Sequence, residues 1–240
     1  SAELIKYAAN AFLATKISFI NEISQICERT GADVKSVAHG MGLDNRIGPK
    51  FLNAGIGYGG SCFPKDVEAL YRTSSEKFYD FRLLRGVMDA NERQKYYFLE
   101  KVTNKLGHNL SGKTFGILGA AFKNGTDDVR KSVALEVIKI LRGWGVTVNL
   151  YDPAALENAK NDLGDENINY MDSAEGVFDN ADALFILTEW ENFTNLDFEK
   201  LSKKMNSKLI FDGKNLLDPK LMESYGYEYF GVGRNGKNGH

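Results

Sequence analysis

The stretch Lys113-Thr114-Phe115-Gly116-Ile117-Leu118-Gly119 decides how the second half of this 240-residue chain folds. It follows a turn-forming segment and is a short apolar run ending at glycine, as in a buried β-strand. Strand-like and helix-like segments then alternate along the chain; the strands are expected at 146–151, 183–187 and 208–211, and the helices at 133–141, 174–178 and 198–204. This alternation predicts a doubly wound α/β domain over residues 108–240, with a parallel sheet covered on both faces.

The first half is predicted to be mostly helical. Apolar residues recur at helical spacing from Glu3 to about Glu28, and Gly31 is suited to end that helix. Asp33 is placed to cap a short second helix. A glycine-rich loop covers residues 40–60, and helices are expected again from Pro64 and over 81–106. We therefore expect a helical domain over residues 1–107.

Composition excludes several classes of protein. Apolar residues make up 43% of the chain and charged residues 26%, which is ordinary for a globular protein and argues against disorder. Thirty basic and 32 acidic residues leave a net charge of -2 without a basic stripe, so no nucleic-acid partner is expected. Apolar runs are too short for a membrane span or a signal peptide. Two cysteines form no disulfide framework, which fits a cytoplasmic location.

The segment Gly57-Tyr58-Gly59-Gly60-Ser61-Cys62-Phe63-Pro64-Lys65-Asp66 carries the sharpest chemical signal. Cys62 precedes a helix that starts at Pro64, and the positive potential at a helix N-terminus, with Lys65 adjacent, favours a thiolate. Asp66, one helical turn on, could orient a water near the sulfur or accept its proton. The alternative is a small buried thiol in a loop that only turns the chain. The glycine, proline and charge context favours a reactive cysteine.

Lys6 and Asn10 stand four residues apart, so both side chains project from one face of the first helix. An ammonium and an amide can together stabilise a developing oxyanion. From spacing alone, however, a solvent-facing stripe is the better interpretation. Cys27 shares a helix face with Ile20 and Ile23 and is interpreted as a core residue.

A nucleotide-binding α/β domain would place phosphates where the first strand ends, here at Ala120-Ala121-Phe122-Lys123. The G-x-G-x-x-G pattern is absent after Gly119, so the sequence offers little support for NAD there and more for a phosphate ligand near Lys123. Asp152 matches a ribose-binding acid by position only, and generic α/β packing is the alternative. The histidines at 39, 108 and 240 lack metal-ligand spacing with cysteine, so no metal is predicted.

Four motifs, in order along the chain, resemble the UDP-glucose/GDP-mannose dehydrogenase family, and most closely its UDP-glucose branch. The first is Lys6-Tyr7-Ala8-Ala9-Asn10, and the second runs from Asn45-Arg46-Ile47-Gly48-Pro49-Lys50-Phe51-Leu52 into the glycine segment that ends at Asp66. The third joins Ala121-Phe122-Lys123 to Thr126, Asp128 and Arg130, and the fourth is Phe211-Asp212-Gly213-Lys214-Asn215. Together they cover essentially the whole chain.

The resemblance implies a central helical dimerisation domain followed by a Rossmann-like UDP-binding domain. It also implies an NAD-dependent oxidation of UDP-glucose to UDP-glucuronate, in two steps and with two NAD⁺. Cys62 would trap the intermediate aldehyde as a thiohemiacetal, which a second oxidation converts to a thioester. Lys6 would stabilise the oxyanions, Asn10 would assist, and Asp66 would handle the proton of the hydrolytic water.

The same resemblance assigns binding residues. The sugar-nucleotide loop would contribute Lys50, Phe51, Leu52, Tyr58 and Gly59, and the α/β domain would contribute Phe122, Lys123 and Lys214. Arg46 would reach the site of the partner subunit in a homodimer, and Lys65 and Arg130 would contact the cofactor. The family often has arginine where Lys214 stands, and lysine cannot form the same bidentate contact.

Two expectations depend on what surrounds these motifs. Members of the family begin with an NAD-binding domain that carries G-x-G-x-x-G, whereas this sequence starts where the central domain starts. We therefore expect the chain as given to bind a UDP-sugar but not to oxidise it. The alternatives are GDP-mannose or UDP-N-acetylmannosamine dehydrogenase, and a non-catalytic UDP-sugar-binding module. Ser61 favours the glucose branch, because the acetylmannosamine branch usually has histidine before its cysteine.

Overall fold

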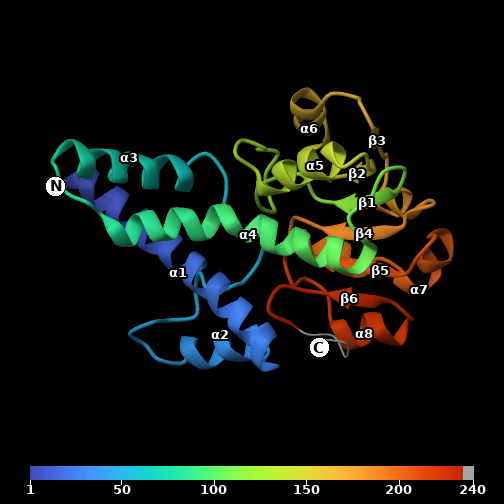
Figure 1. Ribbon diagram of the computed structural model, residues 1–240, viewed down its shortest axis with the longest axis horizontal. Coiled ribbons are helices and arrows are strands. Elements are labelled where there is room, and N and C mark those ends of the chain that lie inside the picture. Colours follow the sequence, from blue (N-terminus) through green and yellow to red (C-terminus); the bar gives the residue numbers. More distant parts are fainter. Residues whose placement is uncertain (235–240) are drawn as a thin grey trace.

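Six strands form one parallel sheet in a computed structural model that describes residues 1–234 (Figure 1). Their order is β3-β2-β1-β4-β5-β6, so the sheet grows one way from β1 and then reverses at β4. The bounds are β1 Thr114–Leu118, β2 Thr147–Tyr151, β3 Ile168–Tyr170, β4 Ala183–Ile186, β5 Leu209–Asp212 and β6 Glu228–Phe230. This arrangement confirms the predicted doubly wound sheet. Residues 235–240, including His240 and the predicted end of the second domain, lie outside the described residues.

Alternate side chains of each strand feed two separate cores on the two faces of the sheet. Phe115 and Phe185 pack on one face with α5 (Val133–Gly143), α6 (Leu156–Leu163) and the end of α4 (Arg82–Leu106). Leu184 and Ile186 pack on the other. That face is covered by shorter helices, namely η1 (Ala174–Phe178), η2 (Glu191–Asn195), α7 (Phe198–Leu201), η3 (Ser202–Lys204) and α8 (Pro219–Ser224).

The helical part contains α1 (Ala2–Thr30), α2 (Val34–Gly42), α3 (Phe63–Glu76) and the start of α4. The predicted boundaries are confirmed: Gly31 ends α1 in the left-handed region at φ 76°, and the Asp33 side chain accepts a hydrogen bond from the backbone N–H of Ser36. α1, α3 and α4 share a small apolar core that includes Ala14, Val67 and Leu84.

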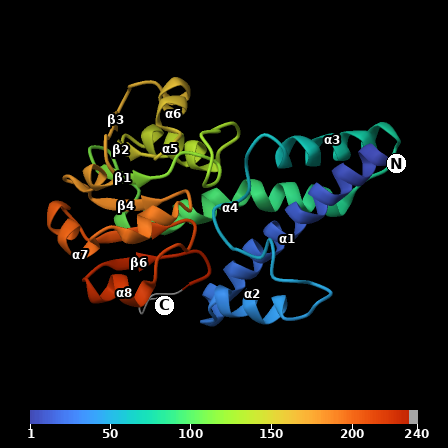
Figure 2. The ribbon, with the colours of Figure 1, turned by 180° about the vertical axis from the view of Figure 1, so that it is seen from behind.

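The long helix α4 connects the two parts (Figure 2). Its first half packs against α1 and α3, whereas Phe98, Leu99 and Val102 in its second half belong to the core beneath the sheet. Partly buried polar contacts join the same parts: Glu28 of α1 accepts hydrogen bonds from Lys101 at 2.5 Å and from the backbone N–H of Gly233 at 2.6 Å. These contacts fix the helical part against the sheet.

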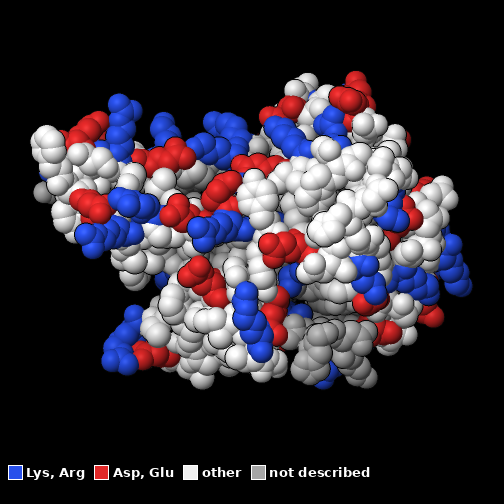
Figure 3. All heavy atoms as spheres, in the orientation of Figure 1, with Lys and Arg blue, Asp and Glu red and all other residues white. Residues whose placement is uncertain are grey.

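Charged side chains of both signs are interspersed on the face shown in Figure 3, without a continuous basic stripe on that face. Among the described residues, no helix combines the length and the hydrophobicity needed to cross a membrane.

Candidate active site

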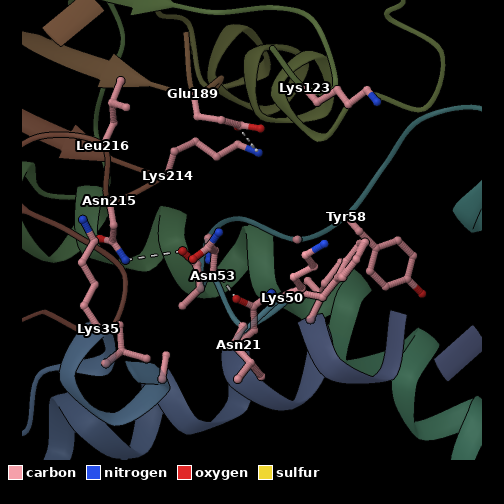
Figure 4. Close-up of a pocket in the computed structure, with 18 of the residues that line it drawn as sticks. Asn21, Lys35, Lys50, Asn53, Tyr58, Lys123, Glu189, Lys214, Asn215 and Leu216 are labelled. Carbon is pink, nitrogen blue, oxygen red and sulfur yellow. Dashed lines mark hydrogen bonds and ion pairs between the residues drawn. The ribbon is translucent and has the colours of Figure 1, made fainter. Parts of the chain in front are cut away.

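A pocket of about 860 Å³ lies where the carboxyl ends of β1, β4 and β5 face α1 and α2 (Figure 4). This is the point at which the strand order reverses, and open α/β sheets bind their ligands there. The lining combines apolar side chains such as Ile17 and Val34 with several lysines. A lining that combines apolar and cationic side chains suits a ligand that carries both a flat ring and phosphates.

Most of the predicted substrate residues meet in this pocket, although they come from distant parts of the chain. Those in the lining are Lys50, Phe51, Leu52, Tyr58, Gly59, Phe122, Lys123 and Lys214. Arg46 is not among the lining residues. Its guanidinium pairs with Asp44 at 2.5 Å, and 89% of its side chain is exposed. In its own chain, Arg46 therefore lies at the surface.

The glycine segment is held tightly in its position between the two parts. Asn91 of α4 accepts a hydrogen bond from the N–H of Tyr58 at 2.8 Å and donates one to its carbonyl at 3.1 Å. A Cβ at Gly59 would lie only 2.2 Å from the carbonyl oxygen of Lys131, and Gly60, at φ 89°, is pressed against the Phe122 ring. Gly59 and Gly60 are therefore required because neighbouring atoms lie too close for a side chain, and Gly60 also because of its positive φ. Burial raises the pKa of Tyr58 to about 12.

Three of the predicted catalytic residues form one polar cluster between α1 and α3. Asp66 is 4% exposed, and its carboxylate accepts a hydrogen bond from the Asn10 amide at 2.6 Å. The Lys6 ammonium lies 3.4 Å from the same carboxylate. The spacing of Lys6 and Asn10 therefore does not mark a purely solvent-facing stripe, because both side chains converge on Asp66.

Cys62 is exposed at the first turn of α3, while Cys27 is buried in the core as predicted. The chain neighbours of Cys62 include Gly59 and Phe63, which line the pocket. Across from it lies the loop after β1, where Arg130 pairs with Asp128 at 2.8 Å. The hydrogen bond between the two side chains holds the pKa of Asp128 below its usual value and raises the pKa of Arg130. Lys65 is exposed on the same turn.

Asp152 has a structural role that its position at the end of β2 did not reveal. It is 3% exposed, and its carboxylate accepts hydrogen bonds from the backbone N–H groups of Ala120 and Ala121 at 2.7 and 3.0 Å. These are the amides that would hold a phosphate at the end of β1, so this strand end does not fit a dinucleotide.

Sequence reasoning missed two charged residues of the pocket. Glu189 follows β4 and pairs with Lys214 at 3.0 Å, and Lys35 projects from α2. The position of Glu189 just beyond a buried strand was a usable signal, because side chains there point into the switch-point crevice. Within residues 1–234, no cluster of three or more His, Cys, Asp or Glu side chains is arranged to hold a metal ion.

Comparison with known proteins agrees with this geometry. Residues 1–93 match the family model "UDP-glucose/GDP-mannose dehydrogenase family, central domain", and residues 116–219 match "UDP-glucose/GDP-mannose dehydrogenase family, UDP binding domain". The chain belongs to the UDP-glucose/GDP-mannose dehydrogenase family. The pocket therefore lies between the central domain and the UDP-binding domain of a family member, and the resemblance seen in the four motifs is confirmed.

Relatives within the family cover the chain almost completely. It is 45% identical to the UDP-glucose 6-dehydrogenase of Rickettsia bellii over 97% of its length and 54% of that protein. It is 46% identical to a UDP-glucose 6-dehydrogenase of Bacillus subtilis over 98% of its length and 50% of that protein. The chain thus spans about half the length of the curated relatives it matches.

Solved structures show the same fold. The UDP-glucose dehydrogenase of Pyrobaculum islandicum superimposes with a TM-score of 0.86 at 36% identity, over 97% of this chain and 51% of that one. A UDP-D-ManNAc dehydrogenase from Pyrococcus horikoshii gives a TM-score of 0.79 at 29% identity, over 96% and 51% of the two chains.

Proposed function

We propose that this chain supplies the sugar-nucleotide site and the catalytic cysteine of an NAD-dependent UDP-glucose 6-dehydrogenase, which forms UDP-glucuronate. The observation that carries the proposal is the pocket at the strand ends. On one side it is lined by the glycine segment, which leads directly to Cys62 and α3. The names of the relatives that match the chain support the choice of substrate.

The pocket suggests how a UDP-sugar lies. Lys123 and Lys214, at the ends of β1 and β5, offer cations to the diphosphate. The part of the lining at α2, which contains Val34 and Ala38, suits the base. The sugar then extends along Tyr58 and Gly59 towards Cys62.

The residues around Cys62 divide the chemistry between them. In the first oxidation, C6 loses a hydride and its hydroxyl loses a proton, which gives the aldehyde. The Cys62 thiolate adds to this aldehyde, and the resulting oxyanion takes up a proton to give a thiohemiacetal. Loss of a hydride and a proton gives a thioester, and attack by water then releases the carboxylate and the thiol. Lys6 and Asn10 stabilise the oxyanions formed at C6. Asp66, positioned by both, accepts the proton of the attacking water.

NAD, when bound, accepts the hydride in each of the two oxidations. The end of β1 does not fit this cofactor, because Asp152 occupies the amides there. Lys65 and Arg130 are exposed cations near Cys62, and we assign them contacts to a cofactor that another domain holds.

Calorimetry with the 240-residue chain tests the substrate site. UDP-glucose is expected to bind, and Lys123→Ala is expected to weaken binding about tenfold, because a cation beside the diphosphate is lost. Lys113→Ala is the matched control, since Lys113 precedes β1 at the opposite end of the strand and should leave the affinity unchanged. Equal affinity for GDP-mannose would contradict the proposed branch of the family.

A regular apolar stripe on α1 supports a homodimer through the central helices. Ile5, Phe12, Phe19 and Ile26 recur every seven residues and are 68%, 66%, 50% and 55% exposed. A stripe with this period suits packing against another helix. Arg46, at the surface of its own subunit, would then reach the site of the partner subunit.

Light scattering is expected to show a dimer for the wild-type chain and a monomer for Phe12→Glu, because a charge in the middle of the stripe would be buried unpaired. Phe78→Glu is the control: Phe78 is fully exposed between α3 and α4, away from the stripe, and its replacement should leave a dimer. A wild-type monomer would refute both the dimer and the role of Arg46.

A further inference from the structure

One carboxylate stands in a pocket that otherwise presents cations. Among the lining residues that the structure describes, Glu189 is the only acidic one, and the basic ones are Lys35, Lys50, Lys123 and Lys214. A site for a diphosphate gains affinity from each cation and loses it from each anion. Diphosphate binding alone therefore does not explain why Glu189 is in this pocket.

Glu189 is directed at one of these cations. In Figure 4 the carboxylate and the Lys214 ammonium point toward each other across the upper part of the pocket, 3.0 Å apart. Lys214 is only 16% exposed in its side chain, so water screens this pair less than a surface pair. Apart from the ion pair, the described residues give the facing oxygen of Glu189 no hydrogen-bond partner.

The backbone on both sides of the pair is fixed. The carboxylate of Asp212, fully buried, accepts hydrogen bonds from the backbone N–H of Lys214 at 3.0 Å and of Leu217 at 2.9 Å. On the other side, Thr188 donates a hydrogen bond to the carbonyl of Ala121 at 2.7 Å. The two side chains can therefore separate only by changing rotamer, and a ligand phosphate that takes Lys214 leaves the backbone of Glu189 beside it.

We infer that Glu189 is an affinity-limiting residue that competes with the ligand's diphosphate for Lys214. In the empty pocket it neutralises Lys214, and in the complex its charge opposes that of the phosphates. The inference rests on the proposed function, since it requires a nucleoside diphosphate in the pocket. Such a device keeps binding weak enough for the product, which carries the same diphosphate, to leave.

The test is the affinity of Glu189→Gln for two ligands that differ in charge, measured by calorimetry and displacement. The amide has nearly the shape of the carboxylate and can still turn its oxygen toward Lys214, so the negative charge is lost with little change of shape. UDP is expected to bind about tenfold more tightly, and uridine, which has no phosphate, less than twofold more tightly. Glu228→Gln is the matched control, because Glu228 forms a half-buried ion pair with Lys105 remote from the pocket, and should change neither affinity.

Each other outcome has a definite meaning. Weaker or unchanged UDP binding by Glu189→Gln would overturn the inference and would indicate a carboxylate that holds Lys214 or a ligand hydroxyl in place. An equal gain for UDP and uridine would overturn it as well, because the effect would then not depend on phosphate charge. If the wild-type chain binds no UDP at all, it is the proposed function that fails.

Discussion

Cys62→Ser is expected to lower NADH production from UDP-glucose by about a thousandfold or more in the complete protein. A serine hydroxyl at the first turn of α3 is a far poorer nucleophile than a thiolate, so neither the thiohemiacetal nor the thioester forms at a useful rate. The measurement is the steady-state absorbance of NADH at saturating UDP-glucose and NAD⁺.

Two comparisons separate chemistry from folding in this experiment. The affinity of Cys62→Ser for UDP should equal that of the wild type, because Cys62 is exposed and is not among the residues that line the nucleotide pocket. Cys27→Ser is the matched control, since Cys27 is the other cysteine, lies in the core and does not line the pocket. It should keep most of the activity. Unchanged NADH production by Cys62→Ser would refute the assignment, and would favour a binding module without redox activity if the pocket still binds UDP.

The sequence predicted the four strands that are four or five residues long. β1 and β4 are central in the sheet, so both of their faces are buried, and residues 115–118 and 183–187 contain no polar side chain. β3 and β6 escaped prediction because they are edge strands of three residues, and Ile168-Asn169-Tyr170 leaves its middle residue exposed. A short half-exposed run does not stand out from a loop.

The candidate site was predictable wherever a motif carried it. The glycine segment and the pairs Lys6–Asn10 and Phe122–Lys123 lie in contiguous sequence, and their resemblance to a family located them. Glu189 lies in no such motif, and its importance depends on Lys214, 25 positions away, reaching the same pocket. The same limitation explains Asp152, whose carboxylate points inward to backbone amides rather than outward to a ligand.

Asp152→Ala is expected to lower the free energy of unfolding by about 4 kcal/mol, the largest loss of stability we predict. The carboxylate accepts five hydrogen bonds: Oδ2 from the amides of Ala120 and Ala121 and from the Trp190 indole at 3.1 Å, and Oδ1 from the amides of Ala154 and Ala155. Removal of this carboxylate leaves five largely buried donors without a partner. The loss of stability is therefore far larger than that for one ordinary hydrogen bond.

Urea denaturation measures the free energy of unfolding, and two further variants serve as comparisons. Asp162→Ala removes a surface carboxylate paired with Lys139 and should cost less than about 0.5 kcal/mol. The loss of unfolding free energy for Asp152→Asn should lie between those for Asp152→Ala and Asp162→Ala. The amide keeps one acceptor oxygen but turns an N–H₂ group toward donors. A loss below about 1 kcal/mol for Asp152→Ala would mean that the loops after β1, β2 and β4 hold their shape without this carboxylate, and the amides of Ala120 and Ala121 would then be available to a phosphate after all.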